Sequence, residues 1–345
     1  MLSVVIIARN EEAHIGRCIE SVLAATRSLG RCEVVLVDSS SDDRTVAIAQ
    51  TYPIRIIELG GVERCCPSMG RHVGVRLTSG EYVQCVDGDT EIDAGWVTAA
   101  LAVMSARPHL GGVAGREDQI YYENGVETGG RPDYFATGDA ESAVDQFGGN
   151  ALYRRAALEA VGSFNPFVRS FEEAELGARL RRDGWRLVRI PVRMATHHTQ
   201  RPDSVDEYWR RVRSHLFTGQ GQVLRIAMRQ GLFWEHARRL NRVLLFLLWS
   251  AVGCGAAVLS MVSSRSMPVV LWVGSTAVVM LGFMIRSRSL IKPFRMVVDW
   301  AVCAAPLAWG FLLNPQHPER FRLEEVVTAD HMGGVGADAP VSVAR

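Results

Sequence analysis

The stretch LSVVIIARNEEAHIGRCIESVLAATRSLGRCEVVLVD, Leu2 to Asp38, decides the fold class. It places two short runs of apolar, mostly β-branched residues on either side of a segment with helical spacing. The alternation continues to residue 87, with helices predicted at 42–52 and 71–78 and strands at IRIIEL (54–59) and EYVQCVD (81–87). Almost wholly apolar strands that alternate with helices are typical of a sheet covered on both faces. We therefore predict an α/β fold with an open, mostly parallel sheet.

The composition and the first turn exclude several function classes. The 345 residues carry 38 Lys and Arg against 37 Asp and Glu, so nothing draws the whole chain to nucleic acid, and no such partner is expected. Seven cysteines form no CxxC pair, which argues against a zinc site or a disulfide framework. The turn ARNEEAHIG has neither GxGxxG nor a P-loop. Because the first apolar run is too short for a signal sequence, we expect the N-terminal part in the cytoplasm.

The C-terminal part of the sequence is more apolar. Residues 202–242 predict basic amphipathic helices at a membrane interface, with a linker helix packed on the α/β domain as the alternative. Uncharged stretches at 243–262 and 267–285 are long enough to span a bilayer. A third candidate, 296–313, contains Asp299 and Pro306 and is expected either to span or to be interfacial or re-entrant.

Arginine placement orients these segments. Arginines precede the first span and separate the second from the third, whereas the turn at 263–266 holds only Arg265. The positive-inside rule then places the α/β domain in the cytoplasm. The predicted organisation is a catalytic domain at 1–201, interfacial helices at 202–242, a membrane region of two to three helices at 243–313 and a flexible tail at 314–345.

Polar residues follow three of the predicted strands. Arg9 and Asn10, Asp38, and Asp87 with Asp89 come where strands end, and ligands bind at that edge of open α/β sheets. Two carboxylates one residue apart suit a hard divalent cation, Mn²⁺ or Mg²⁺, although a solvated acidic turn is the commoner use of such a string.

Five strings together resemble the family 2 glycosyltransferases of the GT-A fold, from Leu2 to about Arg213. They are VVIIARNEEAHIGRCIESV, EVVLVDSSSDDRT, GRHVGVRLTSGEYVQCVDGDTEID, GGNALYRRAALEAVGSFNP and FEEAELGARLRRDGWRLVRIP. The resemblance implies a membrane-attached enzyme of bacterial type, metal-dependent and hexosyltransferase-like, at the inner (plasma) membrane as a multi-pass protein with its catalytic domain in the cytoplasm.

The resemblance also implies roles for individual residues. Glu173 matches the general base of inverting members, with Glu in place of the usual Asp. The implied donor and acceptor contacts are Ala8, Arg9, Glu11, Asp38, Arg71, Asp87, Gly149, Asn150 and Glu172, and the implied metal ligands are Asp87, Asp89 and His197. His72 stands where the family usually has Asn.

Structural alternatives remain for several of these residues. Asp38 could cap the following helix, a role that suits Asp42 better, and Asn150 could be the N-cap of a helix beginning at ALYRRAAL. The acidic residues of FEEAEL also suit a first helical turn. His197 and His198 could be a surface pair.

The sequence thus predicts transfer of a sugar from a nucleotide-diphosphate donor to a hydroxyl of a lipid-linked or cell-envelope polysaccharide acceptor, with inversion and with membrane lipid as a partner. One alternative is a polyprenyl-phosphate sugar synthase, whose acceptor phosphate needs no strong base. A second is a non-catalytic, membrane-bound sensor of sugar nucleotides.

Overall fold

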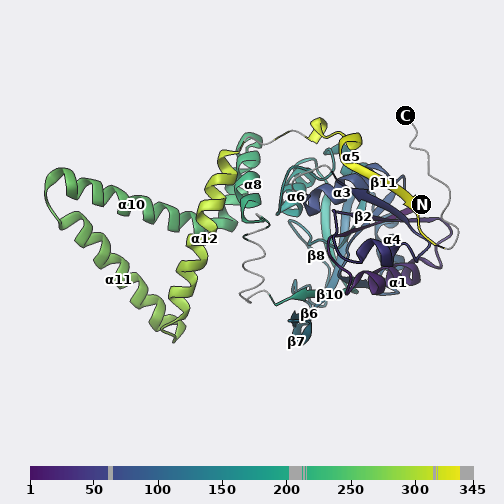
Figure 1. Ribbon diagram of the computed structural model, residues 1–345, viewed down its shortest axis with the longest axis horizontal. Coiled ribbons are helices and arrows are strands. Elements are labelled where there is room, and N and C mark those ends of the chain that lie inside the picture. Colours follow the sequence, from purple (N-terminus) through teal and green to yellow (C-terminus); the bar gives the residue numbers. More distant parts are fainter. Residues whose placement is uncertain are drawn as a thin grey trace. The chain divides into compact units, whose positions relative to one another are not determined.

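The computed structural model describes residues 1–60, 65–201, 212, 214, 216–313, 316 and 318–334 (Figure 1). The chain forms two compact units, one made of Met1–Leu216 together with Pro315–Arg345, the other of Phe217–Asn314. Of the interfacial segment predicted at 202–242, residues 202–211, 213 and 215 lie outside the described residues.

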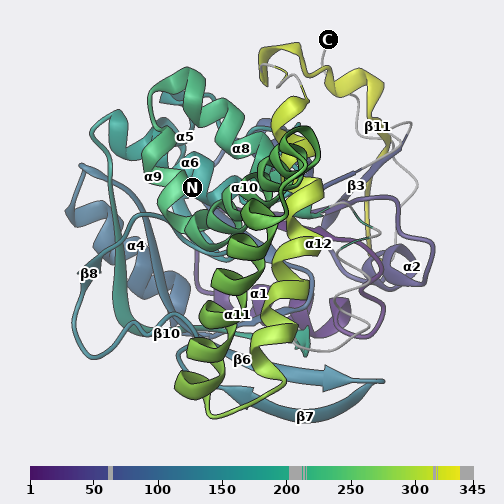
Figure 2. The same cartoon turned by 90° about the vertical axis from the view of Figure 1, so that its left-hand side faces the viewer.

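The first unit is built on one sheet with the strand order β11-β3-β2-β1-β4-β9-β6-β10-β5; β7 pairs with β6 and β8 with β10. The strands are β1 Leu2–Ala8, β2 Cys32–Asp38, β3 Arg55–Leu59, β4 Tyr82–Asp87, β5 Thr90–Ile92, β6 Leu110–Glu123, β7 Val126–Arg131, β8 Ser142–Ala143, β9 Ala151–Arg154, β10 Arg186–Gln200 and β11 Val327–Met332. The sheet is mixed. β3, β2, β1 and β4 are parallel, as are β6 and β10, whereas β9 runs antiparallel between β4 and β6. The hairpin of β6 and β7 is marked in Figure 2.

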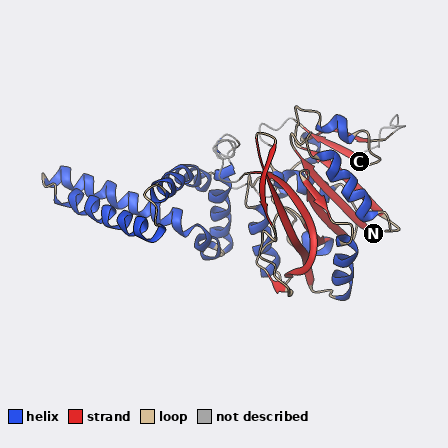
Figure 3. Cartoon of the chain, turned by 90° about the horizontal axis from the view of Figure 1, so that it is seen from below, coloured by secondary structure: helices blue, strands red, loops and turns tan. Residues whose placement is uncertain are grey.

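Helices lie on both faces of this sheet (Figure 3). They are α1 Ile15–Thr26, α2 Thr45–Ala49, α3 Pro67–Arg76, α4 Trp96–Ala106, α5 Arg155–Ala160 and α6 Glu172–Arg182. Every residue of β1 is buried, as an apolar strand covered on both sides requires. Helix α3 packs closely on β1 at Gly74, which has no side chain: an added Cβ there would lie only 2.2 Å from Cγ1 of Val5.

The segment after the second unit contradicts the predicted flexible tail over its described part. Helical turns η2 (Pro318–Arg320) and η3 (Leu323–Glu325) lead into β11, which pairs antiparallel with β3 at the sheet edge. Arg55 donates from Nε and Nη2 to the two carboxylate oxygens of Asp330, at 2.8 and 2.6 Å. Phe321 packs edge-on against His72 at 5.1 Å. Long-range pairing therefore orders a polar segment that has little strand character of its own.

The second unit is helical. Its elements are α8 Leu216–Gln230, which begins one residue before the unit, α9 Phe233–Ala237, η1 Arg238–Leu240, α10 Asn241–Ser263, α11 Met267–Ser287 and α12 Lys292–Leu312. Among the residues that the structure describes, three stretches are long and apolar enough to cross a membrane: Phe233–Ser263, Met267–Ser287 and Lys292–Leu312. Helices α10 and α11 meet at Gly253, where a Cβ would lie 2.5 Å from the ring of Trp272. Trp272 in turn donates from its indole to the carbonyl of Trp249 at 3.1 Å.

Candidate active site

Three parallel strands bring their polar ends together. Ala8 at the end of β1 is the register partner of Asp38 on β2, and Ile7 is the partner of Asp87 on β4. The next turn approaches β1 closely, since a Cβ at Gly88 would lie 2.9 Å from that of Ala8. The predicted convergence of these strand ends is therefore present.

The loops after β1 and β2 are tied to each other. Asp38 is buried and accepts from the backbone N–H of Ser41 at 2.9 Å and from its hydroxyl at 2.5 Å, while burial raises the pKa of the carboxyl group. Asn10, in the left-handed region at φ 58°, accepts from the backbone N–H of Asp42 at 2.9 Å. The suggestion that Asp42 caps the helix is wrong, because Asp43 accepts from the N–H of Thr45.

The other two residues predicted near the nucleotide lie in the same loop. The side chain of Arg9 is exposed. Glu11 is half-buried, and its backbone N–H donates to the hydroxyl of Thr45 at 2.7 Å. Their contact with a nucleotide stays a prediction.

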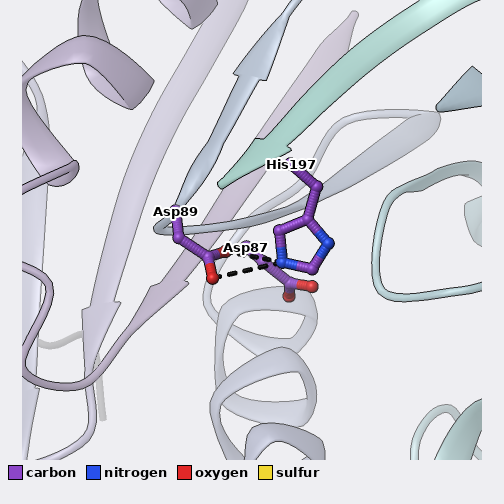
Figure 4. Close-up of side chains that lie close together, drawn as sticks. All are labelled: Asp87, Asp89 and His197. Carbon is purple, nitrogen blue, oxygen red and sulfur yellow. Dashed lines mark hydrogen bonds and ion pairs between the residues drawn. The ribbon is translucent and has the colours of Figure 1, made fainter. Parts of the chain in front are cut away.

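Asp87, Asp89 and His197 form a cluster that suits a metal ion (Figure 4). One ligand atom from each lies within 4.8 Å of the others. Nε2 of His197 is 3.1 Å from Asp89, and its Nδ1 is 3.5 Å from a carboxylate oxygen of Glu117. Burial disfavours the imidazolium, but the two carboxylates outweigh it and hold the pKa of His197 well above its usual range. Two hard oxygen donors and one imidazole, which gives up its proton when a cation binds, fit Mn²⁺ or Mg²⁺.

Asn150 binds the backbone of Asp87, and Gly149 leaves room for its carboxylate. The side-chain oxygen of Asn150 accepts from the N–H of Asp87 at 2.9 Å, and its amide donates to Glu117 at 3.0 Å and to Thr90 at 3.2 Å. A Cβ at Gly149 would lie 2.0 Å from Oδ2 of Asp87. The predicted helix at ALYRRAAL begins late: β9 follows Asn150, so this residue is no N-cap.

Arg71 lies between the metal-type cluster and the start of α6. Its guanidinium is buried and donates from Nη2 to Asp87 at 2.6 Å and from Nη1 to Glu172 at 2.5 Å, with Glu173 at 3.4 Å. Although burial acts in the opposite direction, these carboxylates hold the pKa of Arg71 well above its usual range. The expected contact with donor phosphates stays a prediction, since three carboxylates surround this cation here.

The three acidic residues of the FEEAEL string have different surroundings. Glu175 pairs with Arg179 at 2.6 Å and is buried on the core side of α6. Glu172 is 4% exposed against 19% for Glu173. Burial, and then the neighbouring Glu172, raise the pKa of Glu173 to about 8. A half-buried carboxyl with a raised pKa is well suited to accept a proton near neutral pH.

Sequence reasoning missed Glu117 and Thr90. Glu117 is 2% exposed and links His197 to Asn150 through its two oxygens. It lies inside β6, in a string with no motif, and only the pairing of β6 with β9 and β10 brings it to the site. His198 points elsewhere, pairing with Glu91 at 2.8 Å.

Residues 3–162, which hold most of this site, match the family model described as Glycosyl transferase family 2. This match supports the resemblance to the family 2 glycosyltransferases. Among similar proteins, this chain is 24% identical over 262 residues to Glycosyltransferase AglE of Haloferax volcanii, covering 73% of this chain and 80% of that protein. It is 48% identical over 62 residues to Lipopolysaccharide core biosynthesis glycosyltransferase LpsC of Rhizobium meliloti, 16% of this chain and 20% of that protein.

Two solved structures share the GT-A fold with this chain. The mannosyltransferase PcManGT from Pyrobaculum calidifontis, solved in complex with GDP-Man and Mn²⁺, superposes with a TM-score of 0.57 at 19% identity, covering 89% of this chain and 87% of that one. S. aureus TarS, residues 1–349, gives a TM-score of 0.50 at 17% identity, covering 70% of this chain and 72% of that one. These likenesses show the fold.

Proposed function

We propose that this chain is a family 2 glycosyltransferase that moves a sugar from a nucleotide-diphosphate donor to a hydroxyl of a lipid-linked or polysaccharide acceptor, with inversion and with a divalent metal. One observation carries the proposal. The metal-type cluster Asp87, Asp89 and His197 and the base-type carboxyl of Glu173 flank the same buried arginine, Arg71. A leaving diphosphate and an attacking hydroxyl need such groups on two sides of one sugar carbon.

The residues of the cluster would hold Mn²⁺ or Mg²⁺. When bound, such a cation supplies positive charge that stabilises the leaving nucleoside diphosphate. Asn150 and Gly149 fix the position of Asp87, and His197 is oriented by Glu117. Fixed ligands favour a defined coordination geometry because little reorganisation is needed when the donor binds.

Glu173 would take the proton of the acceptor hydroxyl as it attacks the anomeric carbon. Its carboxylate form accepts that proton, and Arg71 at 3.4 Å stabilises the form that does so. Glu172 is the closer partner of Arg71 and keeps the guanidinium directed at this corner of the site. We assign Glu172 to positioning and Glu173 to proton transfer.

Membrane attachment is supported by the three long apolar helices of the second unit. Membrane attachment and the short match to a lipopolysaccharide core enzyme both favour an acceptor that is itself bound to a membrane or belongs to the cell envelope. Nucleotide sugars are cytoplasmic, which agrees with the arginine-based orientation.

The test is a panel of nucleotide sugars, including GDP-Man, incubated with the full-length protein in membranes and read as released nucleoside diphosphate. We expect donor turnover with Mn²⁺ or Mg²⁺ that is lost in chelator and in Asp89→Ala. Full turnover by the wild type in chelator would contradict the metal role. No turnover of any donor, together with tight donor binding, would favour the non-catalytic sensor.

The same panel separates the two acceptor chemistries. A phosphate acceptor is already ionised, so a polyprenyl-phosphate sugar synthase would transfer equally well when Glu173 is replaced by Gln. A hydroxyl acceptor requires the base, and transfer by Glu173→Gln should then fall while donor binding is retained.

A further inference from the structure

The segment that follows the second, helical unit returns to the first unit, which holds the candidate active site and is called the catalytic unit. Residues Pro315–Arg345 belong to the same compact unit as Met1–Leu216, and β11 is hydrogen-bonded to β3 along its length. The bidentate pair of Arg55 and Asp330 joins the same two strands. A folded unit of this kind lies on one side of a bilayer. The chain therefore leaves and re-enters the same side, and the number of complete membrane crossings between residues 216 and 315 must be even.

Three helices of spanning length cannot all cross under this constraint. Apolar character distinguishes them: the stretch that contains α10 is the most apolar, α11 follows closely, and α12 is the least apolar. Helix α12 also carries Arg295 and Asp299 in its first half and Pro306 in its second. Helices α10 and α11 have uncharged central stretches, so α12 is the one that does not cross.

Contacts within the helical unit agree with this assignment. Helix α12 packs backbone to backbone on α8: a Cβ at Gly221 would lie 2.0 Å from the carbonyl oxygen of Leu307, and one at Gly310 equally close to that of Thr218. Helix α8 carries Arg225 and Arg229 among several glutamines and is too polar for the hydrocarbon core. The second half of α12 therefore lies at the depth of a polar helix.

The free side of α12 is an apolar stripe. Figure 1 shows this helix running across α10 and not alongside it. On its opposite side, Ala304, Leu307 and Gly310 are buried within the unit. The exposed apolar residues recur at helical spacing and are Phe294, Val298, Ala301, Ala305, Ala308, Trp309 and Leu312. A continuous apolar stripe with Lys292 and Arg295 at one end fits the boundary between acyl chains and anionic headgroups.

We propose that the chain crosses the bilayer twice, through α10 and α11, and that α12 lies in the interface on the side of the catalytic unit, with its exposed stripe in lipid. The proposal rests on the membrane attachment within the proposed function and is independent of the sugar chemistry. Its consequence is that both ends of the catalytic unit are held at the same membrane surface.

The test maps four short epitope tags, one per variant, in the full-length protein: before Met1, in the 263–266 turn, beside Ser289 and after Arg345. Inside-out and right-side-out vesicles are probed with an impermeant antibody. We expect the first, third and fourth tags on one side and the turn tag on the other. Terminal tags on opposite sides, or all four on one side, would overturn the proposal. Protein that washes off the vesicles with carbonate would instead refute membrane attachment itself.

A matched pair of substitutions tests α12 directly. Val298 on α12 and Val278 on α11 are both exposed, at 56% and 71%. A lysine at the bilayer centre is costly, whereas one at the interface reaches the headgroups, so V298K should keep membrane levels within about twofold of wild type and V278K should lower them at least about fivefold. Equal loss in both variants would show that α12 spans. Equal tolerance would show that α11 does not cross.

Discussion

Replacing Gly149 with alanine tests how the metal-type cluster is positioned. A Cβ at this position would lie 2.0 Å from Oδ2 of Asp87 and 2.6 Å from Nη2 of Arg71. Carbon and oxygen atoms need about 3 Å or more, so the carboxylate has to move by about 1 Å, and Arg71 moves with it. Gly149 has no positive φ, so the backbone itself accepts alanine, and the effect is purely steric.

A displacement of about 1 Å in a catalytic group typically lowers the rate by about 10²-fold, and that is the loss expected for Gly149→Ala. The half-saturating Mn²⁺ concentration should also rise, because Asp87 is a proposed ligand. Donor turnover as a function of metal concentration gives both quantities. Gly95→Ala is the control, since the nearest atom to its added Cβ is 3.5 Å away. Wild-type turnover and metal dependence in Gly149→Ala, with an unchanged melting temperature, would refute the placement of Asp87.

Three further predictions concern proton transfer and stability. Glu173→Gln should lower the transfer rate by about 10² to 10⁴-fold. The wild-type rate should rise tenfold per pH unit up to about pH 8, because the base acts as a carboxylate and its pKa is raised to about 8. A flat pH profile of the wild type would contradict this. Burial lowers the pKa of His72 from 6.5 to about 4, so between these pH values the unfolded chain binds a proton that the folded chain does not. The free energy of unfolding should therefore fall as pH drops from 6.5 to 4, by about 3 kcal/mol at most. Denaturant titrations at several pH values should show this loss in the wild type and not in His72→Asn, and an equal loss in both proteins would refute the prediction. Asp330→Asn should lower the free energy of unfolding by about 2 kcal/mol, because the pair with Arg55 is lost. An unchanged melting temperature in this variant would show that the pairing of β11 with β3 does not stabilise the fold.

The strand ends of the site could be predicted because they follow buried strands. The runs that became β1, β2 and β4 are apolar enough to be read without a partner, and parallel packing then brings Asp38 and Asp87 to one edge. The pairing of the acidic string at the start of α6 with an arginine was harder to predict from the sequence. The sequence names Glu172 and Glu173, but it does not say that both face Arg71, which lies about a hundred residues earlier.

The rest depends on contacts between distant segments. The string ALYR has helix-forming residues, yet it becomes β9 because β4 and β6 flank it on both sides. The string VTADHM has little apolar character and becomes β11 because β3 offers an unpaired edge and Arg55 offers a partner for Asp330. Glu117 has no local signal at all.

The measurement that tests the central claim most directly is the anomeric configuration of the transferred sugar. With a donor found in the panel, wild-type product is followed by proton NMR, and the coupling at the anomeric carbon gives its configuration. Direct attack by a hydroxyl that Glu173 deprotonates predicts inversion relative to the donor. A product with retained configuration would contradict both the single displacement and the role of Glu173.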